Sequence, residues 1–209
     1  MTAIPAAVGL AEPHHEDVDT IGRRWRTGVL LLILADVAFV VSLIFSYFYL
    51  RGLNTEGSWV PAGAKTATIW VGWAIAAVLV LSAVAYRWGL AGIRAGKTRQ
   101  LVIGMALASV VMLVAAVFQV VQLASFGFKP DANAYASSVY TIAGANLFHL
   151  LLTLFLGAGL WNRSRLGRYT ATSFWQVEIL ASWFAWVAVA ALGGALATSF
   201  IASPNHLSG

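Results

Sequence analysis

One stretch of the chain decides its fold: residues 136–161 read ASSVYTIAGANLFHLLLTLFLGAGLW. The stretch is apolar nearly throughout and exceeds the ~20 residues that a helix needs to cross a bilayer. His149 lies at its midpoint and is the only histidine with a long apolar run on both sides. A titratable ring at bilayer depth is costly to bury and needs a polar partner. The stretch therefore predicts a membrane-spanning helix whose histidine contacts another helix.

The composition extends this interpretation to the whole chain. Hydrophobic residues make up 60% of the 209 residues and charged residues only 10%, whereas soluble domains carry roughly a quarter charged residues. A soluble fold cannot hide this much apolar surface, so lipid must solvate most of it. The sequence predicts an all-α membrane protein: a polar tail over 1–22, then one domain, 23–209, that forms a bundle of five transmembrane helices. The spans are expected near 25–50, 66–88, 101–125, 137–161 and 173–202.

The basic residues predict the orientation of this bundle. Ten of the thirteen lie before the first span, between the second and third, or between the fourth and fifth. These ten are Arg23, Arg24, Arg26, Arg87, Arg94, Lys97, Arg99, Arg163, Arg165 and Arg168, while Arg51, Lys65 and Lys129 lie on the opposite side. By the positive-inside rule, the N-terminus is cytoplasmic and the C-terminus is outside. Because the charge is divided among three loops as a topology signal, a nucleic-acid partner is not expected.

Few polar side chains fall inside the predicted spans. Asp36 and His149 are both near the middle of theirs, so they can meet at one depth, where a carboxylate–imidazole contact offsets part of the burial cost. Gln119 and Gln122 are three residues apart and share one helix face. Glu178 lies near the cytoplasmic end of the last span. Asp36 and His149 could take part directly in proton handling, but a purely structural role is the alternative. That role is interhelical hydrogen bonding for Asp36, His149, Gln119 and Gln122. For Glu178 it is contact with water or an arginine.

Several kinds of chemistry lack the residues that they need. The chain has no cysteine, which excludes disulfides, thiolate metal sites and thiol nucleophiles. Haem ligation by two histidines is not expected, because His14, His15 and His206 lie in the tails. A copper or zinc site lacks ligands for the same reason. We therefore expect no catalytic, cofactor-binding or metal-binding residue in this chain.

Five segments place acidic, aromatic, amide and glycine residues in a distinctive order. They are residues 34–51 with Asp36, the loop 59–63, the pair at 119 and 122, the run 135–149 with Asn146 and His149, and residues 177–184 with Glu178. This order resembles subunit III of the haem–copper terminal oxidases, the cytochrome c oxidase subunit 3 family, in its short five-helix bacterial form. The loop is similar to the family's Trp-Pro-Pro-x-Gly segment, and the fourth run to its Gly-x-His-x-x-His segment. The resemblance covers residues 27–192.

The chain also departs from the family's usual pattern. The family has glutamate at the positions of Asp36 and Gln122, and histidine at the position of Asn146. It has histidine and aspartate where this chain has Ala185 and Ala188. Polar character is kept at the first three positions, but titratable groups are lost at four. The chain resembles a divergent member, and a mechanism that relies on the lost groups is not transferred to it.

The resemblance implies a subunit without haem or copper in a complex of the bacterial cytoplasmic membrane. It implies contact with subunit I, which carries the haem and copper, and with subunit II. It also implies that the chain binds phospholipid and supports proton uptake and oxygen access. Its lipid cleft or buried polar candidates are Asp36, His149, Glu178, Gln119, Gln122 and Asn146, and its interfacial basic candidates are Arg51, Arg94, Arg163 and Arg165. Two alternatives stay open: a similar partner of a quinol oxidase or nitric-oxide reductase, and an independent small transporter. Against the transporter, the sequence has no internal repeat.

Overall fold

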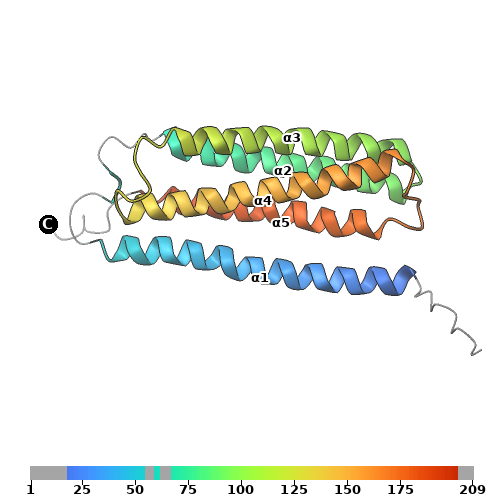
Figure 1. Ribbon diagram of the computed structural model, residues 1–209, viewed down its shortest axis with the longest axis horizontal. Coiled ribbons are helices and arrows are strands. Elements are labelled where there is room, and N and C mark those ends of the chain that lie inside the picture. The colour runs from blue at the N-terminus through green and yellow to red at the C-terminus, as the bar shows by residue number, and fades with distance from the viewer. Residues whose placement is uncertain (1–17, 55–58, 62–66, 202–209) are drawn as a thin grey trace, which may run out of the picture.

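The structure is a computed structural model that describes residues 18–54, 59–61 and 67–201. Five helices run along the long axis of the molecule (Figure 1). They are α1 (Val18–Gly52), α2 (Ala67–Arg94), α3 (Thr98–Ala124), α4 (Ala134–Arg165) and α5 (Trp175–Thr198). All five are long and apolar enough to cross a membrane. The predicted all-α bundle of five transmembrane helices is confirmed.

The helices are longer than most of the predicted spans. Helix α1 begins at Val18 and thus includes the last residues assigned to the polar tail. Helix α4 continues four residues beyond Trp161, to Arg165, whereas α5 ends at Thr198, before the predicted 202. Hydropathy marks the part of a helix inside the hydrocarbon, while the helix itself can continue into the headgroup region. The tail up to residue 17, together with Lys65 and His206, lies outside the described residues.

Local signals in the sequence set the helix ends. The Asn133 side chain accepts a hydrogen bond of 2.9 Å from the Ala136 backbone N–H and caps the start of α4. Gly96 after α2 and Gly167 after α4 have positive φ angles of 72° and 68°. At both glycines the backbone closes a Schellman motif, with Lys97 N–H donating to Gly92 O and Arg168 N–H donating to Arg163 O. These tight ends keep the basic loops short.

The helices pack unequally. Helices α2 and α3 make the most extensive contact, and α1 packs mainly against α4 and α5 (Figure 1). At the α2–α3 crossing, a Cβ on Gly104 would lie 2.5 Å from Gly89 Cα, so only glycine allows this approach. The most apolar part of α1 contains no buried residue, whereas 56% of the corresponding part of α5 is buried. Helix α1 is therefore the peripheral helix and α5 the central one.

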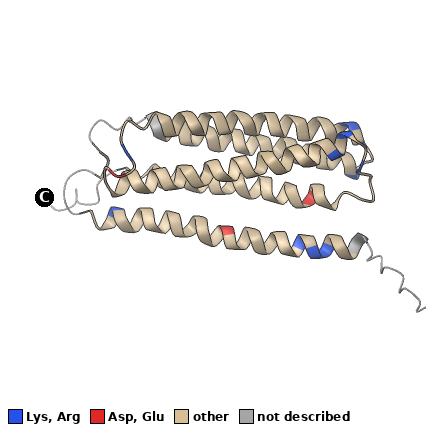
Figure 2. Cartoon of the chain, viewed as in Figure 1, with Lys and Arg blue, Asp and Glu red and all other residues tan. Residues whose placement is uncertain are grey.

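Charged residues divide the bundle into a basic end and a nearly uncharged middle. Figure 2 shows Lys and Arg gathered where α1 begins and where the α2–α3 and α4–α5 connections lie. The other end contains an aromatic cluster of Tyr47, Trp59, Phe126 and Tyr135. Trp59 is only 2% exposed and donates a hydrogen bond of 3.2 Å to Tyr47 Oη, so it belongs to this cluster and does not project to the membrane surface. The described residues place one polar site at mid-membrane and another at the basic end.

Candidate functional site

The mid-membrane site is centred on Asp36 of α1. His149 Nε2 of α4 lies 3.0 Å from Asp36 Oδ1, and Trp186 Nε1 of α5 donates a hydrogen bond of 2.5 Å to Asp36 Oδ2. The His149 side chain is 3% exposed and that of Asp36 15%. The contact expected from the depths of Asp36 and His149 is therefore present. We call these three residues the Asp36 clasp, because one carboxylate joins the peripheral helix to two others.

A second set of contacts, made by Thr153 and Trp183, surrounds His149. Thr153 Oγ1 donates to the His149 carbonyl oxygen at 2.6 Å and accepts from Trp183 Nε1 at 2.9 Å. The Trp183 ring meets the imidazole edge-on, with the ring centroids 6.0 Å apart. Buried indole N–H groups usually find such an acceptor. Helices α4 and α5 are thus hydrogen-bonded to each other at the depth where α1 contacts them.

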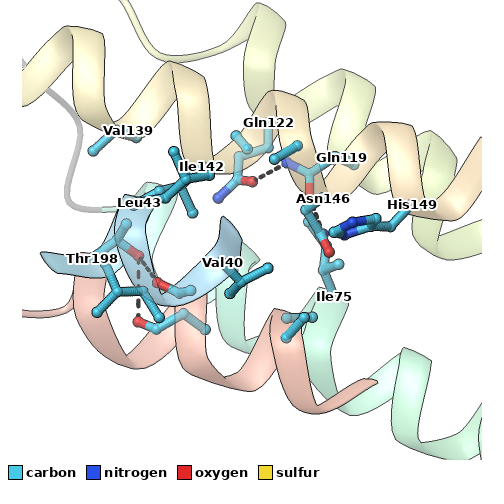
Figure 3. A pocket seen from close by; sticks show the side chains of 18 of the residues that line it. Val40, Leu43, Ile75, Gln119, Gln122, Val139, Ile142, Asn146, His149 and Thr198 are labelled. Atoms are coloured by element: carbon cyan, nitrogen blue, oxygen red, sulfur yellow. Dashed lines mark hydrogen bonds between the residues drawn. The ribbon is translucent and has the colours of Figure 1, made fainter. Parts of the chain in front are cut away.

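An amide chain continues from α4 to α3. Asn146 Nδ2 donates to Gln119 Oε1 at 2.6 Å, and Gln119 Nε2 donates to Gln122 Oε1 at 2.7 Å (Figure 3). Gln119 and Gln122 are 2% and 8% exposed, so both amides are removed from lipid. Asn146 precedes His149 by three residues and lies on the same face of α4. The two glutamines and Asn146 therefore form one interhelical network beside the clasp.

A cavity of about 60 Å³ lies beside this network (Figure 3). Its polar lining is Gln119, Gln122, Asn146, His149 and Thr198, and its walls are apolar residues of α1, α2, α4 and α5. Asn146 Oδ1 is buried and has no hydrogen-bond partner among the described residues. A cavity of this size has room for a few water molecules, and water needs such polar partners. The described part of the chain contains no cluster of three or more His, Asp or Glu residues that could hold a metal ion.

The sixth predicted polar residue, Glu178, belongs to a separate site at the basic end. Its carboxylate pairs with Arg26 of α1 and, at 2.9 Å, with Arg94 of α2. The two arginine side chains are 50% and 56% exposed, and that of Glu178 is 20% exposed. Of the alternatives for Glu178, contact with an arginine is the one that the structure shows. This bridge joins α1, α2 and α5 near the membrane surface.

The other three basic candidates lie apart from both sites. Arg51 is in the last turn of α1, at the opposite end from Glu178. In the last turn of α4, the Arg163 guanidinium lies 6.0 Å from the centroid of the Tyr169 ring, and that of Arg165 lies 4.7 Å from the Trp161 ring. Burial raises the pKa of Tyr169, and Arg163 partly opposes this shift. The ten predicted residues thus form a mid-membrane site, a basic-end site and separate interfacial contacts.

Comparison with known proteins identifies the family. The family model "Cytochrome c oxidase subunit III" matches residues 9–192. The chain belongs to this family. Among curated proteins, it is 26% identical over 148 residues to cytochrome c oxidase subunit 3 of Cyanidium caldarium, an alignment that covers 69% of this chain and 54% of that protein. It is 23% identical over 200 residues to the Prototheca wickerhamii protein of that name, covering 90% and 76%, and 27% identical over 150 residues to that of Arabidopsis thaliana, covering 69% and 56%. The chain spans about half the length of two of these three relatives.

Sequence reasoning missed part of the clasp in this subunit III family member. From the sequence, the aromatic cluster of Trp183, Phe184 and Trp186 indicates only packing or lipid contact, but both indoles donate hydrogen bonds in the site. The available signal was the unmet need of a buried carboxylate for a second donor. Tryptophans three residues apart on α5 could have supplied it. Thr153 gave no signal, because a threonine inside an apolar helix commonly bonds its own backbone, as it also does here.

Proposed function

We propose that the chain is the non-catalytic subunit III of a haem–copper terminal oxidase and acts in aerobic respiration, where electron transfer to oxygen drives proton translocation. The family match over residues 9–192 carries this proposal. Haem and copper are assigned to partner subunits. The chain itself is proposed to contact and stabilise subunit I, in a complex that also contains subunit II.

The Asp36 clasp supports a stabilising role. Helix α1 has a wide apolar face with exposed residues such as Leu31 (62%) and Phe45 (66%), which is suited to lipid or another membrane subunit. The clasp fixes the rotation and depth of this face relative to α4 and α5, because Asp36 can meet His149 and Trp186 in only one register. A partner that contacts α1 would therefore meet a preorganised surface.

Bound phospholipid and support of proton or oxygen access complete the proposal. The cavity beside His149 supports it, because it brings imidazole and amide groups together with apolar walls at mid-membrane. We assign the basic end to the cytoplasm by the positive-inside rule. The corresponding location is the bacterial cytoplasmic membrane. The electron donor, cytochrome c or quinol, is selected by other subunits, so this chain leaves a quinol oxidase or a nitric-oxide reductase system as the alternative partner.

Affinity purification of the tagged chain in mild detergent tests the proposal. We expect a haem spectrum in the eluate together with a large co-purifying membrane subunit, and the absorption bands would distinguish the haem type. A colourless, solitary chain would contradict the proposal, provided that the same preparation keeps another membrane complex intact. Transport by vesicles that contain the chain alone would then support the transporter alternative.

A further inference from the structure

The cavity beside the amide network is lined by a hydrogen-bond acceptor that has no donor. Asn146 Oδ1 is buried and has no hydrogen-bond partner among the described residues. The other end of the same amide is already used, because Nδ2 donates to Gln119 Oε1 at 2.6 Å. An unpaired carbonyl oxygen costs free energy where water is excluded, and lipid hydrocarbon supplies no donor. A molecule in the cavity that Asn146 lines can supply it.

Thr198 gives the same cavity a second acceptor (Figure 3). Its hydroxyl hydrogen is used within α5, since Oγ1 donates to Gly194 O at 2.9 Å. The lone pairs of Oγ1 remain, so in this arrangement Thr198 can accept a further hydrogen bond but cannot donate one. Thr198 is the last residue of α5, whereas Asn146 lies near the middle of α4. The cavity therefore extends from mid-membrane toward the end of the bundle opposite the basic loops.

The chemistry of the lining indicates an uncharged molecule that donates hydrogen bonds. The described lining contains no carboxylate, lysine or arginine, and an ion without a charged partner is costly at this depth. The acceptor oxygens would repel an anion, and an apolar molecule would leave Asn146 Oδ1 unpaired. A water molecule can donate two hydrogen bonds and also accept them. The cavity volume of about 60 Å³ exceeds the ~15 Å³ that one water needs, so several fit.

We propose that this cavity is a binding site for a short row of buried water molecules, which donate hydrogen bonds to Asn146 Oδ1 and Thr198 Oγ1. The row extends the amide network of α3 and α4 to α5. Buried waters of this kind satisfy polar groups that the protein leaves unpaired, and they are costly to remove. Water is thus a structural component of the bundle. The inference concerns the cavity alone and holds for any complex that the chain joins.

Solid-state NMR on the full chain in lipid bilayers tests this site. Glutamine side chains are labelled with ¹⁵N, and magnetisation is transferred from water protons to their amides. Gln119 lines the cavity and is only 2% exposed, whereas Gln100, at the basic end, reports contact with bulk water. Thr198→Val removes the α5 acceptor and keeps the shape of the side chain. Thr141→Val is the matched control, because the Thr141 hydroxyl also donates to the carbonyl four residues earlier, at 2.8 Å, but is exposed and does not line the cavity.

We expect water transfer to both Gln119 and Gln100 in the native chain. Thr198→Val should lower the transfer to Gln119 about twofold, because it removes one of the two acceptors, and Thr141→Val should leave it unchanged. Transfer to Gln100 without transfer to Gln119 would overturn the site, since the cavity would then be dry. Transfer to Gln119 from lipid acyl protons in place of water would also overturn it, and equal losses in the two valine variants would remove Thr198 from the site. No partner subunit takes part, so failure of the oxidase proposal remains distinguishable.

Discussion

The mid-membrane clasp and the basic-end bridge both connect α1 to the rest of the bundle, but in different surroundings. Each uses one carboxylate to join α1 to two other helices. Asp36 of α1 contacts α4 and α5. Glu178 of α5 contacts Arg26 of α1 and Arg94 of α2. The clasp excludes solvent from His149, whereas the arginines of the bridge are at least half exposed. A polar contact that is shielded from water is strong, whereas an exposed ion pair is screened and contributes little. The clasp should therefore determine the position of α1, and the bridge should mainly set charge at the membrane surface.

Asp36→Ala should have the largest effect. It leaves the buried His149 imidazole and the partly buried Trp186 indole N–H without their acceptor, which costs about 3 kcal/mol for polar groups that lose their partner. We expect a lower thermal unfolding midpoint of the detergent-purified chain and a lower yield of the assembled complex. In the complex, activity should also decay faster during turnover.

Asp36→Glu is the matched control for this variant, because it keeps the carboxylate and restores the residue that the family usually has. We expect it to retain most of the native assembly yield. Native yield and native activity decay in Asp36→Ala would remove Asp36 from the stabilising site.

Trp186→Phe should have a smaller effect that separates the hydrogen bond from the ring. It removes the donor to Asp36 Oδ2 and keeps most of the aromatic surface, so we expect a loss of about 1–2 kcal/mol. Thermal unfolding should place this variant between the native chain and Asp36→Ala. If Trp186→Phe matched the native chain, the clasp would reduce to the Asp36–His149 pair alone.

The same contrast explains what the sequence could predict. The number and position of the helices follow from apolar runs, because a bilayer fixes helix length. The meeting of Asp36 and His149 follows from depth, since few other polar groups could serve. The role of Trp186 depends on which faces the helices turn to one another. That rotation is set by close contacts such as the Gly89–Gly104 crossing, which hydropathy does not encode.

The amide network should contribute less than either clasp residue. Gln119→Leu and Asn146→Leu each break the same α3–α4 hydrogen bond, so the double variant should be less unstable than the sum of the two changes. We expect a coupling of about 0.6–1.7 kcal/mol, the range for hydrogen bonds between transmembrane helices. A double-mutant cycle on unfolding in detergent measures it, and strictly additive effects would contradict a shared network.

Glu178→Gln should change stability least, by less than about 1 kcal/mol, and this loss should shrink further at high salt. The change removes the acceptor that Arg26 and Arg94 share. Thermal unfolding of the detergent-purified native chain and variant at low and high salt measures the difference. If Glu178→Gln instead destabilised the chain as much as Asp36→Ala, the burial of the partner side chains would not determine how much each carboxylate contributes. The bridge would then help to position α1 as strongly as the clasp does.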